Sequence, residues 1–163
     1  VAGKGSVKLA TGSENITPPL GTGTVDYSLG TVAAWIGLKY GVYGDVSYVF
    51  NGSSEELSRG NSLTYNAAIG YRLIPAVYDT YPTQVVNLYL ELNGKYASRD
   101  KLIGQEVANS GGNEVFVSPG IQYIPSRNFL VEGSVQIPVL NSLNGTQLGT
   151  DFMANLGVRL LLF

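Results

Sequence analysis

The stretch GVYGDVSYVF, residues 41–50, divides into two alternating sets of side chains. One set is apolar or small, and the other carries Asp45 and Ser47. A period of two residues is typical of a β-strand whose two faces meet different surroundings. The stretch alone leaves open which face meets water, because a soluble barrel hides its apolar face whereas a membrane barrel turns that face to lipid.

The composition of the chain limits the classes of protein to which it can belong. Residues 1–163 are enough for one domain, and we expect a single domain. Charged residues make up 13% of the chain, about half of the ~25% usual in soluble domains. The net charge of −2 offers no basic surface to a nucleic acid. Because the chain has neither Cys nor His, we expect no enzymatic activity, no metal site and no cofactor.

The two-residue period recurs along most of the chain. Most of the alternating segments hold 10 to 14 residues. A strand of a soluble protein has about five or six residues, whereas a tilted strand that crosses a membrane needs about 9–11. The lengths therefore favour an antiparallel, up-and-down transmembrane β-barrel with eight visible strands. The predicted strands are residues 5–11, 25–38, 41–50, 62–74, 85–96, 114–124, 129–140 and 151–163.

The connections between the predicted strands alternate in length. Long stretches rich in Gly, Ser, Asn and Thr lie at 12–24, 51–61, 97–113 and 141–150. Shorter connections lie between them, at 39–40 and 125–128, although the connection 75–84 is long for a turn. Outer-membrane barrels have long outside loops and short periplasmic turns, so this alternation agrees with such a barrel.

The polar set of side chains consists mainly of amides and hydroxyls, with a few charged groups. Small polar groups that can bond one another suit an enclosed, wet interior. We expect Glu91 near mid-height, Lys95 toward the long loops, and the other charged residues toward the short turns. The candidate residues that line this interior are Asp45, Arg72, Glu91, Lys95, Glu132 and Arg159. If the last two strands pair symmetrically about their loop, Glu132 lies opposite Arg159.

The aromatic residues on the apolar set decide between water and lipid. They gather near the two ends of the predicted strands, with aliphatic residues between them. Outer-membrane barrels carry aromatic girdles at both membrane interfaces, whereas a soluble core has no reason to sort aromatic residues by height. A soluble ligand-binding barrel remains the alternative. The predicted interface residues are Tyr27, Trp35, Tyr48, Phe50, Tyr65, Tyr71, Tyr123, Phe129 and Phe152.

Several short motifs recur in a fixed order along the chain. They include Thr11-Gly12, the GTG that precedes Asp26, the SGG at 110–112, Ser118-Pro119-Gly120 and the QIPV at 136–139. In this order the chain resembles the bacterial outer-membrane proteins of the MetA phenol-degradation pathway family. The resemblance implies a Gram-negative outer-membrane barrel that lets small hydrophobic or aromatic compounds pass. Members of this family extend further at the N-terminus, so two alternatives stay open: the eight segments form a whole barrel, or they form the C-terminal part of a larger one.

Two functions remain open for the charged groups of the interior. In a complete eight-stranded barrel, the interior is just filled by side chains, and these groups form a plug. The barrel then conducts nothing and acts through its loops or its assembly partners. In a wider barrel, completed by further sequence or by a second chain, the same groups line a passage and set its selectivity. The expected partners are membrane lipid and small hydrophobic compounds, and the expected location is the bacterial outer membrane.

Overall fold

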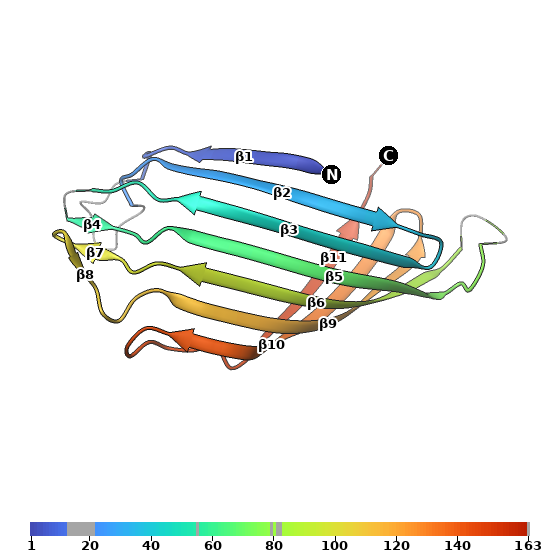
Figure 1. The fold of residues 1–163 in the computed structure, drawn as a ribbon. Coiled ribbons are helices and arrows are strands. Elements are labelled where there is room, and N and C mark those ends of the chain that lie inside the picture. The colour runs from blue at the N-terminus through green and yellow to red at the C-terminus, as the bar shows by residue number, and fades with distance from the viewer. Residues whose placement is uncertain (13–21, 55, 79, 81–82, 163) are drawn as a thin grey trace.

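Eight strands form one antiparallel sheet, in which each strand pairs with the next of the eight along the chain (Figure 1). The computed structural model describes residues 1–12, 22–54, 56–78, 80 and 83–162. The order in the sheet is β1-β2-β3-β5-β6-β9-β10-β11. The strands are β1 (Ala2–Lys8), β2 (Asp26–Ile36), β3 (Tyr40–Phe50), β5 (Ser62–Ile74), β6 (Val85–Ala97), β9 (Gly112–Ser126), β10 (Phe129–Leu143) and β11 (Met153–Leu160).

The eight predicted strands are confirmed in number, order and direction, and most of their ends agree within two or three residues. The strand predicted at 5–11 instead occupies Ala2–Lys8, because its first residues carry too little contrast in polarity to reveal the alternation. The last strand is shorter than the predicted 151–163. Phe163 and most of the predicted loop 12–24 lie outside the described residues.

Two of the predicted long loops contain a second, three-stranded sheet. Its strands are β4 (Leu57–Ser58), β7 (Lys101–Leu102) and β8 (Gln105–Glu106), in the order β4-β7-β8. The turn between β7 and β8 has positive φ angles of 50° at Ile103 and 75° at Gly104, as a two-residue hairpin turn requires. The prediction of 51–61 and 97–113 as plain loops was therefore wrong, because two-residue strands are too short to show a period.

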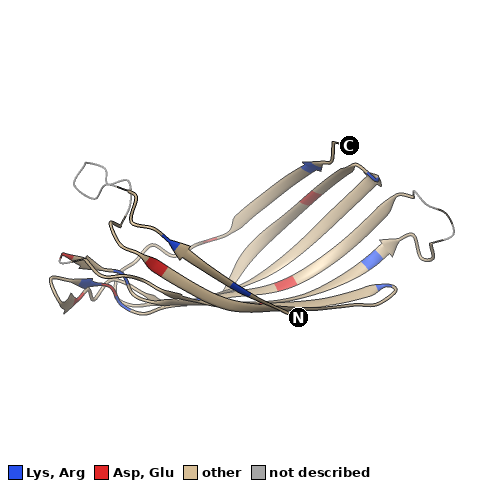
Figure 2. Cartoon of the chain, turned by 90° about the horizontal axis from the view of Figure 1, so that it is seen from above, with Lys and Arg blue, Asp and Glu red and all other residues tan. Residues whose placement is uncertain are grey.

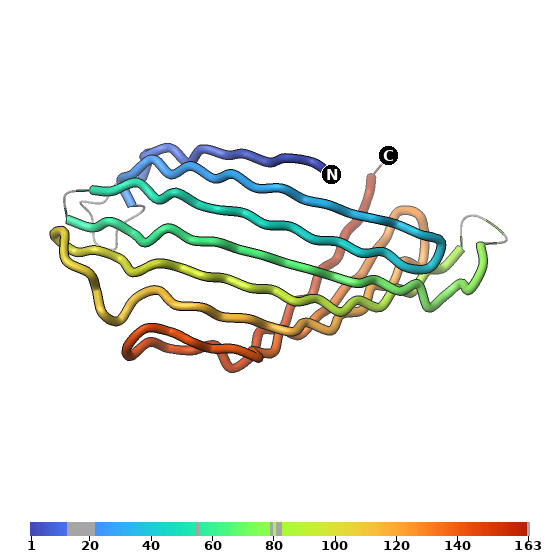
Figure 3. Tube along the Cα trace, in the orientation of Figure 1, coloured from blue at the N-terminus to red at the C-terminus, as the bar shows by residue number. Residues whose placement is uncertain are grey.

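The main sheet is strongly curved, so that β9, β10 and β11 curl round from the plane of the first strands (Figures 1 and 2). The tube in Figure 3 follows the same path without a break in the order of the strands. Among the described residues, β1 pairs only with β2 and β11 only with β10. The all-β, antiparallel, eight-stranded sheet is thus confirmed, and in the described part of the chain it is open at both edges.

Little of the sheet is buried. Among the described residues, the buried hydrophobic side chains are Val85 and Phe116. The accessible surface is 11061 Å², whereas a compact protein of 17.3 kDa exposes about 7,800 Å². The described residues contain no helix long and apolar enough to cross a membrane. The two faces of the sheet, rather than an enclosed core, therefore carry the chemistry of this protein.

Candidate functional site

The six predicted lining residues come from five different strands and share one face of the sheet, which we call the polar face. Residues paired across neighbouring strands point to the same side of a sheet, as do residues two apart in one strand. Asp45 pairs with Asn66, which pairs with Asn93, and Glu91 and Lys95 flank Asn93 in β6. Arg72 pairs with Asn87 of β6, and the chain of pairs continues through Gln122 to Glu132.

One row of hydrogen bonds crosses the polar face from β3 to β9. Asn66 Nδ2 donates to Asp45 Oδ1 over 3.0 Å, and Asn93 Nδ2 donates to Asn66 Oδ1 over 3.2 Å. Ser118 Oγ donates to Asn93 Oδ1 over 2.6 Å, and Ser118 is only 1% exposed. Each amide in the row both donates and accepts, so the row ties four strands together through their side chains.

At the edge of the sheet, Lys4 extends this row to β1. Its Nζ lies 3.2 Å from Asp45 Oδ2, although β2 separates the two strands. The side chain crosses β2 at Gly30, where a Cβ would lie only 2.8 Å from Lys4 Cε and 2.5 Å from Ser47 Oγ. Glycine at position 30 therefore provides the path along which this lysine reaches its carboxylate.

A second row crosses the polar face nearer the short turns. Gln122 Oε1 accepts hydrogen bonds from Asn87 Nδ2 at 3.0 Å and from Tyr89 Oη at 3.3 Å. Gln122 Nε2 donates to Glu132 Oε2 at 3.0 Å. Arg159 of β11 reaches Glu132, with 3.9 Å between Nη2 and Oε1. The two rows together connect β1 with β11 across the width of the sheet.

Two of the expected positions need correction. Arg159 pairs with Leu130 rather than with Glu132, because the register differs by two residues from the symmetric one. The ion pair nevertheless forms diagonally, since residues two apart in a strand share a face. Asp45 does not lie in the half near the short turns, because its register places it level with Asn93, on the loop side of Glu91.

Arg72 lies near the short turns and is held by its own connection. Its Nε donates to the carbonyl oxygen of Pro75 at 3.1 Å, and its guanidinium lies 4.0 Å from the centre of the Tyr78 ring. Stacking of this kind orients an arginine while leaving part of its fork available. The long connection that follows β5 thus positions one of the charges on the polar face.

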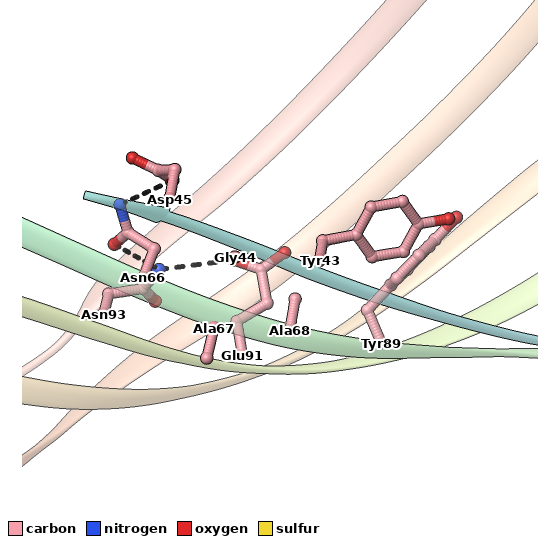
Figure 4. Close-up of a pocket in the computed structure, with 9 residues that line it drawn as sticks. All are labelled: Tyr43, Gly44, Asp45, Asn66, Ala67, Ala68, Tyr89, Glu91 and Asn93. Atoms are coloured by element: carbon pink, nitrogen blue, oxygen red, sulfur yellow. Dashed lines mark hydrogen bonds between the residues drawn. The ribbon is translucent and has the colours of Figure 1, made fainter. Parts of the chain in front are cut away.

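Two tyrosines on the polar face were not among the predicted site residues. Tyr43 precedes Asp45 by two residues, and Tyr89 precedes Glu91 by two, so both share the face of those carboxylates. With Asp45, Asn66, Ala68 and Glu91 they line a hollow of about 530 Å³ (Figure 4). The alternation places both tyrosines on this face, but only charged residues were selected as candidates for the site.

The opposite face, which we call the apolar face, carries the predicted interface aromatics near its two ends. Cross-strand pairs join Tyr27 to Phe50 at the loop end, and the rings of Tyr48 and Phe50 lie 4.6 Å apart. At the turn end, the ring of Tyr40 lies 5.1 Å from that of Tyr71, which adds Tyr40 to the predicted set. Also in strands on this face are Trp35, Tyr65, Tyr123 and Phe129, whereas Phe152 directly precedes β11.

The fold and the two faces define the class of the protein, which is an all-β protein built on one curved antiparallel sheet. One face of this sheet is polar and hydrogen-bonded, and the other is apolar and is covered by no described residue. Among the described residues, no group of acidic side chains is arranged to hold a metal ion. The chain belongs to the family described as "Putative MetA-pathway of phenol degradation", whose model matches residues 1–152. No curated protein matches the chain, and no solved structure matches it.

Proposed function

We propose that the chain forms part of the wall of an outer-membrane β-barrel in a Gram-negative bacterium. Its polar face lines a passage for small hydrophobic or aromatic compounds. One observation carries this proposal, namely that no described part of the chain covers the apolar face. Leu156 is 82% exposed and Trp35 64% exposed, although both lie within strands of the sheet. Contiguous apolar surface of this extent is typical of contact with a membrane or another protein.

The distribution of aromatic side chains favours lipid over a protein partner. Aromatic rings gather toward both ends of the apolar face, and Leu90 and Leu92 lie between them in β6. This sequence of aromatic, aliphatic and aromatic levels is the one that outer-membrane barrels present to the two interfaces and the hydrocarbon core. A protein partner would not require this sorting by height, so membrane lipid is the proposed contact of this face.

The open edges of the sheet bear on the two alternatives for the interior. Eight strands closed on themselves would leave an interior just filled by side chains. Among the described residues, β1 and β11 do not pair with each other, which supports a wider barrel that further strands complete. Those strands come from additional sequence or from a second chain. In such a barrel the polar face borders a passage, and the proposal assigns no catalytic step or cofactor to it.

The test uses two neighbouring alanines that point to opposite faces. Ala68 pairs with Tyr43 and Glu91 on the polar face, whereas Ala67 pairs with Gly44 and Leu92 on the apolar face. The full chain is reconstituted in liposomes, and swelling is measured in phenyl glucoside, whose sugar keeps it from crossing lipid unaided. We expect faster swelling than in protein-free liposomes, slowed by Ala68→Trp and unaffected by Ala67→Trp.

Two outcomes of this test would reject the proposal. In the first, the protein resists extraction at alkaline pH, which shows that it is inserted, but the liposomes swell no faster than protein-free liposomes. The inserted protein then contains no passage for the solute. Equal effects of the two tryptophan variants would mean that the polar face does not border the route of the solute. The swelling rate in glucose measures the selectivity of the passage. A passage for aromatic compounds is expected to admit phenyl glucoside at least as fast as glucose, although glucose is smaller.

A second candidate function is a non-conducting barrel that acts through its loops, and the small sheet β4-β7-β8 favours it. This sheet is held by defined contacts, including a hydrogen bond from Gly60 N to Asp100 Oδ1 at 2.8 Å. An ion pair joins Arg99 to Glu106 over 3.3 Å. Ordered loops can present a fixed surface to a partner. Insertion without solute flux would favour this candidate over transport.

A further inference from the structure

Glu91 differs from the other carboxylates of the polar face in its electrostatic surroundings. Asp26 contacts Lys8, Asp45 contacts Lys4 and Glu132 contacts Arg159. Glu114 pairs across the strands with Lys95. Glu91 is the carboxylate near the middle of β6, and its neighbours on the same face are all uncharged. These neighbours are Ala68 and Ser118 across the strands, and Tyr89 and Asn93 in its own strand.

The carboxylate of Glu91 opens into the hollow of about 530 Å³. Figure 4 shows it between two different groups of side chains, with the amides of Asn66 and Asn93 on one side and the rings of Tyr43 and Tyr89 on the other. Asn93 Nδ2 donates weakly to Glu91 Oε2, over 3.5 Å. Glu91 therefore keeps most of its capacity to accept hydrogen bonds or to face a positive charge.

The two tyrosine rings are held in place by glycines beneath them. A Cβ at Gly70 would lie 2.8 Å from the ring of Tyr89 and 3.7 Å from the ring of Tyr43. A Cβ at Gly41 would lie 2.9 Å from the ring of Tyr43. The rings thus lie over backbone that carries no side chains, and Tyr89 is fixed further by its hydrogen bond to Gln122. The sequence supplies a rigid aromatic surface beside the carboxylate.

We propose that this hollow is a binding site for a small organic cation, such as a quaternary ammonium group attached to an apolar body. The faces of aromatic rings attract cations, and Glu91, which makes no ion pair with any described residue, supplies the balancing charge. A neutral ligand would use the rings alone, and an anion would be repelled by Glu91. All residues of the site belong to the described sheet, so ligand binding can be measured without any solute flux. The binding site is therefore an inference separate from the proposed passage.

The test is a titration of the full chain in zwitterionic detergent with benzyltrimethylammonium, followed by NMR. Benzyl alcohol and benzoate are the neutral and anionic probes of similar size. We expect the cation to bind about tenfold more tightly than benzyl alcohol, since a charge pair is added to the ring contacts. Glu91→Gln removes that charge and is expected to reduce the affinity to about that of the alcohol.

Matched variants separate the site from general electrostatics. Glu114→Gln removes an acid from the same face whose cross-strand neighbour is Lys95, and it is expected to leave the affinity unchanged. Tyr89→Ala is expected to weaken binding about twofold to fivefold through the loss of one ring. If Glu91→Gln does not fold, the preference of the unaltered chain for the cation and the effect of Tyr89→Ala decide the question.

Binding of benzyl alcohol as tight as that of the cation would overturn the proposal, and so would equal losses from Glu91→Gln and Glu114→Gln. The outcome is independent of transport. Cation binding in a chain that gives no flux rejects the passage and keeps the site. Flux of phenyl glucoside in a chain that does not bind the cation rejects the site and keeps the passage.

Discussion

A charge placed at the middle of the apolar face gives the sharpest test of contact with lipid. Leu90 lies five residues after the start of β6 and seven before its end. At about 3.4 Å per residue and a tilt near 40°, it lies about 13 Å and 18 Å in height from the two ends. This is close to the middle of an apolar band about 25 Å tall, where Arg costs about 2–4 kcal/mol. We therefore expect Leu90→Arg to destabilise the protein folded in lipid vesicles by about 2–4 kcal/mol.

The assay is a reversible urea titration of folding into vesicles. Leu63→Arg is the matched control, because Leu63 pairs with Tyr48 and Tyr96 at the loop-end aromatic level of the same face. Near an interface the same substitution costs about 0–1 kcal/mol. Leu90 is 52% exposed, so in contact with water its replacement would change stability by only about 0.5 kcal/mol. Equal, small costs at both positions would refute the contact with lipid.

Three further predictions concern the stability of the folded sheet and use the same titration. Gly94→Ala is expected to cost about 1–3 kcal/mol, because its Cβ would lie 2.1 Å from a tyrosine ring, whereas Gly3→Ala, with open space around it, is expected to be nearly neutral. Ser118→Ala is expected to cost about 1–3 kcal/mol by removing the donor to Asn93 Oδ1, and a cost below that of an exposed serine would contradict the role of this row. Arg159→Ala is expected to cost less than about 1 kcal/mol, because its ion pair is largely exposed, and a larger loss would show that the second row depends on it.

The architecture of the main sheet could be predicted because the two-residue period is a direct property of strand geometry. The range 62–74 was predicted without error, since Thr64, Asn66 and Arg72 alternate there with apolar residues. The first strand began earlier than predicted because Ala2, Gly3 and Gly5 hide its period. The short strands of the small sheet form by pairing between loops that are distant in the sequence, and a local sequence pattern does not predict such pairing.

The site was predicted in part. Alternation placed all six charged candidates on one face, because the face of a residue depends only on its parity within the strand. The contacts between them depend on register, and the expected register of β10 and β11 was in error by two residues. The path of Lys4 over Gly30 and the ring of Tyr89 over Gly70 required three-dimensional information, since each joins residues that are distant in the sequence.

The two open edges impose a rule on whatever completes the sheet. The eight strands alternate in direction, so β1 and β11 run opposite to each other. An all-antiparallel ring that contains them must add an even number of strands, with zero included. The start of β1 pairs near the end of β2, and the end of β11 pairs with the start of β10, so β1 begins and β11 ends on the side of the short turns. If further strands complete an all-antiparallel barrel, the number of strands in that barrel should therefore be even.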